Sequence, residues 1–136
     1  MTTTTVQTNS QPIRTSTDVV LVRQIVRTVA VKIGLGLVDQ TKVVTAASEL
    51  ARNTLDYGKG GDVHVEEITD GYRKGMRLTF VDQGPGIVDL DKALTDGYTT
   101  GGGLGMGLSG SRRLMSEFTI KTAPGEGTTI IATKWK

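Results

Sequence analysis

A glycine-rich segment in the second half of the chain has a composition suited to binding phosphate groups. Residues 101–108 read GGGLGMGL and lead into a stretch with the apolar spacing of a helix. Glycine lets a backbone approach a phosphate closely, and the start of a helix directs N–H groups and positive dipole toward it. No dinucleotide-binding βαβ unit surrounds the segment, and no glycine run ends in Lys-Ser or Lys-Thr. The segment predicts a phosphate site that is not a P-loop, with a flexible or closely packed loop as the alternative.

A second segment, DQGPGI at residues 82–87, places a carboxylate directly after a predicted strand. Ligand pockets often lie where strands end, and a carboxylate there can accept a hydrogen bond from the amino group of a base. Gly84 and Gly86 would leave room for a flat ring beside the backbone. The alternative is a tight Gly-Pro-Gly turn in which Asp82 only caps its own loop.

A third segment, SELARN at residues 48–53, places Glu49 and Asn53 one helical turn apart. Side chains at that spacing share one face of a helix. The amide oxygen of Asn53 suits Mg²⁺, which prefers oxygen ligands and keeps waters and substrate phosphates in its shell. Glu49 could then orient or deprotonate an attacking hydroxyl group. The alternative is a solvated polar helix face.

Composition excludes several other classes of function. The chain has 136 residues, a formal net charge of +2, no cysteine and a single histidine. These values predict one domain and argue against nucleic-acid binding, disulfides, thiolate metal sites and multi-histidine metal sites. The sequence has no signal peptide and no apolar run near the roughly 20 residues of a membrane span. We therefore expect a cytoplasmic protein with no membrane association.

The pattern of apolar residues predicts the elements that position the three segments. Residues 1–11 are read as a disordered tail, and residues 12–136 as a single domain. Helices are predicted from a cap at Thr17 or Asp18, from a cap at Asp39 to about Tyr57, and over 104–115. Strands are predicted at 63–68, 76–81, 118–122 and 128–135, with a short one near 12–17. Helices on one face of a mixed, mostly antiparallel sheet are the natural arrangement.

Taken together, the three segments resemble the motifs of the GHKL ATPase/kinase superfamily, which includes gyrase B, Hsp90, MutL and histidine-kinase catalytic domains. SELARN is similar to the N box, and DQGPGI and GGGLGMGL are similar to the two glycine boxes. Within the superfamily the chain resembles RsbT-type serine/threonine kinases of bacterial partner-switching systems. The resemblance covers 12–136 and extends to residues 38–40, 113–115 and 127–129. It implies the Bergerat ATP-binding fold, an α/β two-layer sandwich.

The resemblance also implies a role for each site residue. Asn53 would bind Mg²⁺, Glu49 would be the catalytic carboxylate, and Asp82 would bind the adenine amino group with Thr128 nearby. Residues 88–100 would form a short ATP lid. The remaining cofactor-binding positions would be Gly84, Gly86, Ile87, Gly101, Gly102, Gly103, Leu104, Gly105, Met106, Gly107 and Leu108.

The function implied by the resemblance is that of a switch kinase. It would transfer the γ-phosphate of ATP to a serine or threonine of STAS-domain stressosome proteins. After release it would bind and activate a PP2C-type phosphatase. Three alternatives stay open: an anti-sigma factor that phosphorylates an anti-anti-sigma protein, a detached histidine-kinase catalytic domain, and a module that binds nucleotide without catalysis.

Overall fold

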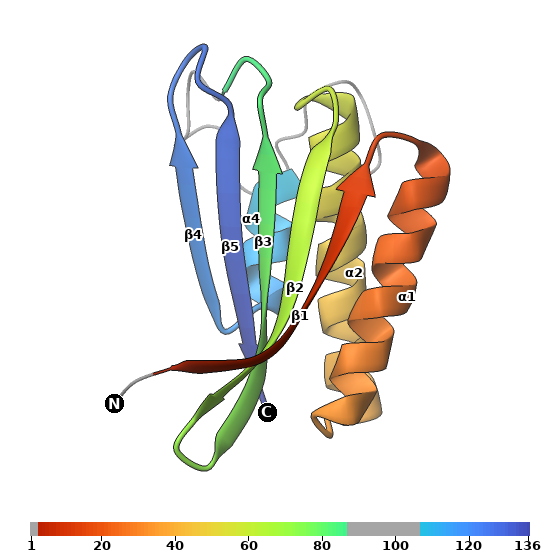
Figure 1. Ribbon diagram of the computed structural model, residues 1–136, viewed down its shortest axis with the longest axis vertical. Coiled ribbons are helices and arrows are strands. Elements are labelled where there is room, and N and C mark those ends of the chain that lie inside the picture. Colours follow the sequence, from red (N-terminus) through yellow and green to blue (C-terminus); the bar gives the residue numbers. More distant parts are fainter. Residues whose placement is uncertain (1–2, 87–106) are drawn as a thin grey trace.

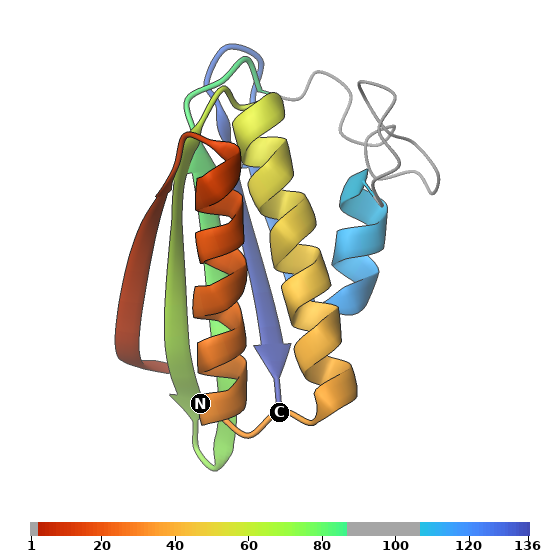
Figure 2. The same cartoon turned by 90° about the vertical axis from the view of Figure 1, so that its right-hand side faces the viewer.

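The computed structural model describes residues 3–86 and 107–136, which form two layers. One layer is a five-stranded sheet, and the helices of the described ranges lie side by side on one face of it (Figure 1, Figure 2). None of these helices is both long and apolar enough to cross a membrane. The α/β two-layer sandwich is thus confirmed. The elements are β1 (Thr4–Ile13), α1 (Ser16–Lys32), α2 (Leu37–Asp56), β2 (Gly61–Asp70), β3 (Arg73–Asp82), α4 (Gly107–Leu114), β4 (Glu117–Thr122) and β5 (Thr128–Trp135).

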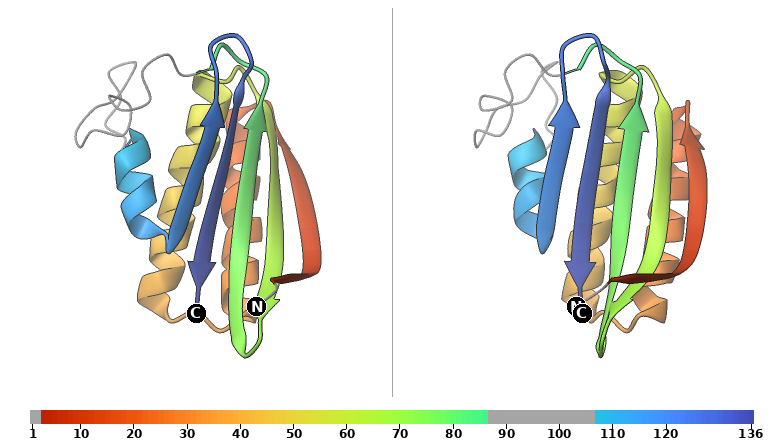
Figure 3. Two further views of the ribbon diagram at one scale, coloured as in Figure 1. Left: turned by 90° about the vertical axis from the view of Figure 1, so that its left-hand side faces the viewer. Right: turned by 60° about the vertical axis from the view of Figure 1, so that its left-hand side comes forward.

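The strands follow the order β1-β2-β3-β5-β4 across the sheet. We predict a mixed, mostly antiparallel sheet from the sequence, and every pairing between the described strands is antiparallel. The β2 and β3 strands extend beyond their predicted limits, because the polar residues between them continue the ladder from Gly61↔Asp82 to Asp70↔Arg73. The views in Figure 3 show the opposite face of the sheet, which carries no helix from the described ranges.

The N-terminal segment corrects one prediction, since residues 4–11 are not a disordered tail. They belong to strand β1, which pairs with β2 from Thr4↔Thr69 to Ile13↔Gly61. The side chains of this edge strand are mostly exposed, and Ile13 is its one buried residue. Its threonines suit an extended backbone, and the ladder satisfies their amide groups. The segment shows no pattern of apolar residues because hydrogen bonds to β2, more than burial of side chains, hold it in the sheet.

The caps of the first two helices also differ from prediction. Thr15 is the N-cap of α1, and its side chain forms a capping box with Asp18, whose carboxylate accepts from the Thr15 N–H at 3.1 Å. The N-cap of α2 is Gly36, which makes no side-chain hydrogen bond. Asp39 lies in the first turn of α2, where its negative charge interacts favourably with the helix dipole. Its Oδ1 atom lies 3.7 Å from Lys134 Nζ.

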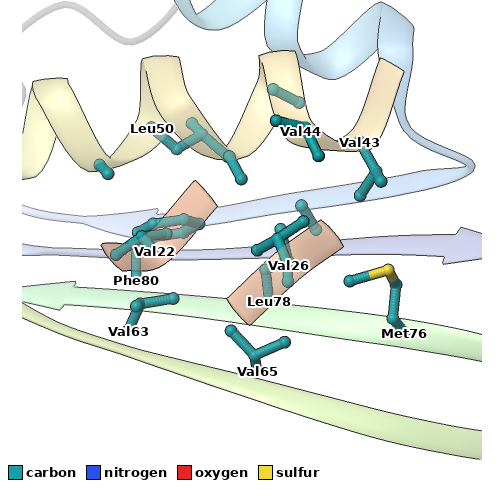
Figure 4. Packing of buried hydrophobic residues seen from close by; sticks show 14 of the residues in the cluster. Val22, Val26, Val43, Val44, Leu50, Val63, Val65, Met76, Leu78 and Phe80 are labelled. Atoms are coloured by element: carbon teal, nitrogen blue, oxygen red, sulfur yellow. The ribbon is translucent and has the colours of Figure 1, made fainter. Parts of the chain in front are cut away.

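The core fills the space between the two layers with side chains from facing apolar stripes. Figure 4 shows valines of α1 and α2 above the buried residues of β2 and β3. Every second residue of β3 points toward the helices, because side chains alternate along a strand. Ile25 of α1 packs against this core and is only partly buried. The fully buried members shown include Val22, Val26, Val43, Leu50, Val63, Val65, Met76 and Leu78.

The open face of the sheet carries a cross-strand ion pair. Arg77 donates from Nε to Glu66 Oε1 at 2.9 Å and from Nη2 to Oε2 at 3.0 Å, and Thr5 donates to Oε2 at 2.8 Å. The hydrogen bond from Arg77 lowers the pKa of the Glu66 carboxyl, although its burial opposes the shift. The same bond raises the pKa of Arg77. The pair therefore ties β1, β2 and β3 together only while Glu66 is ionised.

We expect Glu66→Gln to destabilise the protein at neutral pH and to have no effect in acid. A carboxyl with a lowered folded-state pKa contributes stability above its unfolded pKa, near 4.3 for an ordinary glutamate, and loses it as the pH falls through the folded value. Because 32% of the Arg77 side chain is exposed, we expect a loss of only about 0.5–1 kcal/mol. Urea unfolding across this pH range measures it, with Glu126→Gln in an exposed turn as the control. A pH-independent difference would contradict the pair's role.

Candidate active site

The site residues gather at one end of the sandwich because the antiparallel register aligns the strand ends there. Asp82, the last residue of β3, pairs with Gly61 on one side and with Thr128 on the other, and Thr128 pairs with Thr122. Asp82 and Thr128 alternate in step with the buried Phe80 and Ile130, and Thr122 alternates in step with the partly buried Ile120, so all three lie on the helix-facing side of the sheet. The C-terminal end of α2 lies at this same end of the molecule (Figure 1, Figure 2).

The carboxylate of Asp82 has one oxygen engaged and one directed elsewhere. Its Oδ1 atom accepts a hydrogen bond from the Gly84 N–H at 2.9 Å, which fixes the side chain over the loop that follows β3. Within the described ranges Oδ2 has no hydrogen-bond partner. The alternative in which Asp82 only caps its own loop therefore accounts for half of the carboxylate, and Oδ2 remains as an acceptor for a ligand.

A glycine after α2 makes room for this carboxylate. Gly58 follows directly on the helix, where its N–H donates to the Asn53 carbonyl oxygen at 3.2 Å. A β-carbon on Gly58 would lie 2.5 Å from Cγ and 2.6 Å from Oδ2 of Asp82. Such contacts are far inside van der Waals distance, so any other residue would displace the carboxyl group. The glycines after Tyr57, whose role the sequence leaves open, thus include one that shapes the site.

The other glycines of this end bring backbone segments into contact. A β-carbon on Gly84 would lie 2.8 Å from Gly58 Cα, and one on Gly127 would lie 2.2 Å from the Asp82 carbonyl oxygen. Gly86 has a φ of +76°, and its β-carbon would lie 2.1 Å from the carbonyl oxygen of Ala123. We predict from the sequence that Gly84 and Gly86 make room for a flat ring. In the structure their bare faces meet neighbouring backbone, which holds the loops around Asp82 together.

Two threonine hydroxyls meet where β4 ends and β5 begins, and one of them belongs to Thr128, the partner of Asp82 in the ladder. The Oγ1 atoms of Thr122 and Thr128 are 2.9 Å apart, and Thr122 also donates to the Gly127 carbonyl oxygen at 3.1 Å. Thr128 is a predicted site residue, whereas sequence reasoning missed Thr122. Its position directly opposite Thr128 in the β4–β5 hairpin is the signal that would have revealed it.

Glu49 and Asn53 occupy the last turns of α2, as predicted, and both are partly exposed. The Asn53 backbone carbonyl accepts from the N–H groups of Tyr57 and Gly58, and its carboxamide has no hydrogen-bond partner among the described residues. In these same ranges no group of three or more His, Cys, Asp or Glu side chains could hold a metal ion. One amide oxygen fits a Mg²⁺ ion whose other ligands are phosphate oxygens and water.

The predicted phosphate loop is covered by the structure only at its C-terminal end. Gly107 is the first residue of α4, so its N–H belongs to the start of a helix. The Leu108 side chain is buried in the hydrophobic core, so it is not available to a ligand. Ile87, the lid at 88–100, and the residues Gly101, Gly102, Gly103, Leu104, Gly105 and Met106 lie outside the described residues.

Comparison with known proteins shows the family of the chain. Residues 38–136 match the model of the histidine kinase-, DNA gyrase B- and HSP90-like ATPases. The chain is 48% identical over 123 residues to the serine/threonine-protein kinase RsbT of Bacillus subtilis, covering 90% of this chain and 92% of that protein. It is 27% identical to an anti-sigma F factor from a Thermoanaerobacter species over 83% of this chain and 82% of the other.

A solved structure shows the same fold. The crystal structure of the RsbU and RsbW domains of a Mycobacterium tuberculosis protein superposes with a TM-score of 0.66 at 23% identity. The superposition covers 96% of this chain and 33% of that one. The chain therefore belongs to the histidine kinase-, DNA gyrase B- and HSP90-like ATPase family, as an ATP-using serine/threonine kinase of the RsbT type.

Proposed function

We propose that this kinase transfers the γ-phosphoryl group of Mg²⁺-ATP to a serine or threonine of STAS-domain stressosome proteins. We also propose that, once released, it binds and activates a PP2C-type phosphatase. The observation that carries the catalytic part is the half-engaged carboxylate of Asp82 at the end of the sandwich where α2 presents Glu49 and Asn53. In this proposal Asp82 binds the adenine base, and Glu49 and Asn53 lie on the side of the phosphates, which gives the orientation of the bound nucleotide.

In this proposal the adenine amino group donates to Asp82 Oδ2, with the Thr128 hydroxyl beside it. The phosphates would extend toward the N-terminus of α4. There the backbone N–H of Gly107, the first residue of the helix, would face them. Gly58 adjoins the Asp82 carboxylate, and Glu49 and Asn53, on the turns of α2 that precede it, would lie at the triphosphate end. The base end and the phosphate end are therefore joined by the last turns of one helix.

Phosphoryl transfer passes through a loose transition state, so positioning and charge neutralisation carry most of the catalysis. Asn53 would hold Mg²⁺ through its amide oxygen, and the bound ion supplies neutralisation of phosphate charge. The Glu49 carboxylate, one turn earlier, would accept a hydrogen bond from the substrate hydroxyl and orient its oxygen toward the phosphorus. The chain thus supplies a base acceptor, a metal ligand and a hydroxyl acceptor.

The choice of partners rests on the degree of likeness. The identity to RsbT is 48%, against 27% to the anti-sigma F factor from Thermoanaerobacter. This difference favours a switch kinase with STAS-domain substrates over an anti-sigma factor, although both would share the ATP site. Incubation with Mg²⁺-ATP and candidate STAS-domain proteins, followed by mass mapping, should locate an acid-stable phosphoserine or phosphothreonine. Tight binding of a sigma factor would instead favour the anti-sigma role, and acid-labile phosphohistidine would favour a histidine kinase.

Glu49→Gln should separate nucleotide binding from catalysis. We expect ATP affinity to stay within about twofold of the parent and phosphoryl transfer to fall by about 10²-fold or more, because the variant keeps an amide oxygen but loses the charged, basic carboxylate that would accept the hydroxyl proton. Calorimetric ATP binding and radiolabel transfer measure the two effects. Asp56→Asn is the matched control, since it removes the same charge from an exposed position on the same helix. Equal transfer rates in Glu49→Gln and parent would remove Glu49 from the mechanism.

Asp82→Asn should abolish tight ATP binding while preserving the fold. The asparagine oxygen can still accept from the Gly84 N–H, but its amino group then replaces the acceptor that faces the base. We expect ATP affinity to fall by about tenfold to a hundredfold, the range for hydrogen bonds to charged groups. Asp62→Asn, on the neighbouring strand, controls for the loss of charge. An unchanged ATP affinity in Asp82→Asn would refute the assignment of the adenine end.

Gly58→Ala tests whether the glycine after α2 positions the Asp82 carboxylate. The added methyl group would displace that carboxyl group, so we expect a loss of ATP affinity of about tenfold or more, comparable to losing the hydrogen bond itself. In an Asp82→Asn background the same change should cost little further affinity, because the two act through one group. Gly36→Ala is the control, since a β-carbon there has no atom within 4 Å. Parent-like affinity in Gly58→Ala would contradict this role.

A further inference from the structure

The hydroxyl groups of Thr122 and Thr128 belong to a short chain of hydrogen bonds that ends at the Gly127 carbonyl oxygen. A hydroxyl group has a single proton to donate and two lone pairs that accept. Thr122 donates to the Gly127 carbonyl oxygen at 3.1 Å, and a carbonyl oxygen can only accept. The 2.9 Å contact between the two Oγ1 atoms then requires the proton of Thr128. Thr128 is thereby fixed as the donor to Thr122.

This direction decides what Thr128 offers to a ligand. With its proton held by Thr122, the Thr128 hydroxyl presents only lone pairs to its surroundings. Thr128 is 8% exposed and lies opposite Asp82 in the β3–β5 ladder, on the helix-facing side of the sheet. Asp82 Oδ2 is also an acceptor, because the carboxylate carries no proton when ionised. Of the described residues at this corner, Asp82 and Thr128 therefore both present acceptors, and neither offers a hydroxyl proton to a ligand.

A corner with acceptors alone distinguishes between purine bases. An exocyclic amino group carries two protons and satisfies both acceptors, whereas a carbonyl oxygen at the same place would face lone pairs and leave buried polar groups unpaired. A Thr128 hydroxyl that could rotate would instead donate to such a carbonyl and weaken the distinction. The polarity of the threonine pair is therefore as important for base choice as the presence of Thr128.

We propose that Thr122 is a positioning residue for base selection: by accepting the Thr128 proton, it makes the site favour a 6-amino purine nucleotide over a 6-oxo purine nucleotide. This inference rests on the proposed assignment of the adenine end at Asp82. Thr122 itself needs no contact with the nucleotide, because it acts through Thr128. Its carbonyl acceptor, Gly127, belongs to the turn whose backbone lies against Asp82, so the chain is anchored to the same corner.

Thr122→Val tests the proposal because valine preserves the shape and the strand preference of threonine but removes the hydroxyl. Direct binding of ATP, GTP and purine riboside triphosphate, which has only hydrogen at position 6, should be measured. We expect the preference for ATP over GTP to fall by about tenfold, the effect of one hydrogen bond, while affinity for purine riboside triphosphate stays within about twofold. Thr122→Ser should restore the preference, because it returns the hydroxyl.

Two further variants make the outcomes distinguishable. Thr119→Val, on the same strand but exposed on the open face, should leave every affinity unchanged. An equal loss for all three nucleotides in Thr122→Val, or an unchanged preference for ATP over GTP, would overturn the positioning role. Asp82→Asn serves as the reference for the site itself. If that variant loses ATP while Thr122→Val keeps the parent's preference, the Thr122 role alone fails; if Asp82→Asn binds ATP normally, the adenine assignment fails first.

Discussion

The loops around Asp82 pack so closely that several of their residues can have no side chain. The carboxyl group lies against the bare Cα of Gly58, the Asp82 carbonyl oxygen lies against Gly127, and Gly84 lies against Gly58. Each of these contacts joins two segments that are distant in the sequence: the end of α2, the end of β3 and the turn between β4 and β5. The glycines therefore do more than loosen the chain, because they let three backbone segments meet around one carboxylate.

This meeting point depends on the register of the sheet. Met76, Leu78 and Phe80 are buried under the helices, which fixes which face of β3 points inward and therefore where Asp82 points. A slip of one residue in either ladder would turn every side chain of the strand to the other face. Pairing on both sides of β3 leaves no freedom for such a slip, since Asp82 is opposite Gly61 in one ladder and Thr128 in the other. The apolar core thus orients a polar group at the end of the sheet.

Much of this arrangement can be read from the sequence, and the exceptions have physical causes. Helical spacing locates α1 and α2 because each buries one stripe, and alternation locates β3 and β5 for the same reason. The β1 strand gives no such signal, since backbone pairing holds it and its side chains are mostly exposed. The helix caps differ from prediction because several neighbouring polar residues can serve, and only the backbone geometry selects Thr15 and Gly36.

At the site, too, the residue types can be read from the sequence, but their hydrogen-bond partners depend on how the chain packs. Residue type alone indicates that Asp82 and Asn53 offer oxygen atoms to a ligand. Whether such atoms remain available depends on neighbours: the Gly84 N–H occupies one oxygen of Asp82, and the Thr128 hydroxyl lies 2.9 Å from the hydroxyl of Thr122. Such choices involve pairs from different strands, which no local pattern contains.

The helix α2 links the two ends of the proposed nucleotide site into one rigid unit. Glu49 and Asn53 lie one turn apart on it, and the Asn53 carbonyl accepts the N–H of Gly58, which touches Asp82. Leu50 and Ala51, between them in sequence, are fully buried and hold the helix against the sheet. A shift of α2 along its axis would therefore move Glu49 and Asn53 and, at the same time, change the contact between Gly58 and the carboxylate. If Glu49 and Asp82 act as proposed, in a reaction that depends mostly on positioning, this coupling makes the geometry at Glu49 depend on the geometry at Asp82.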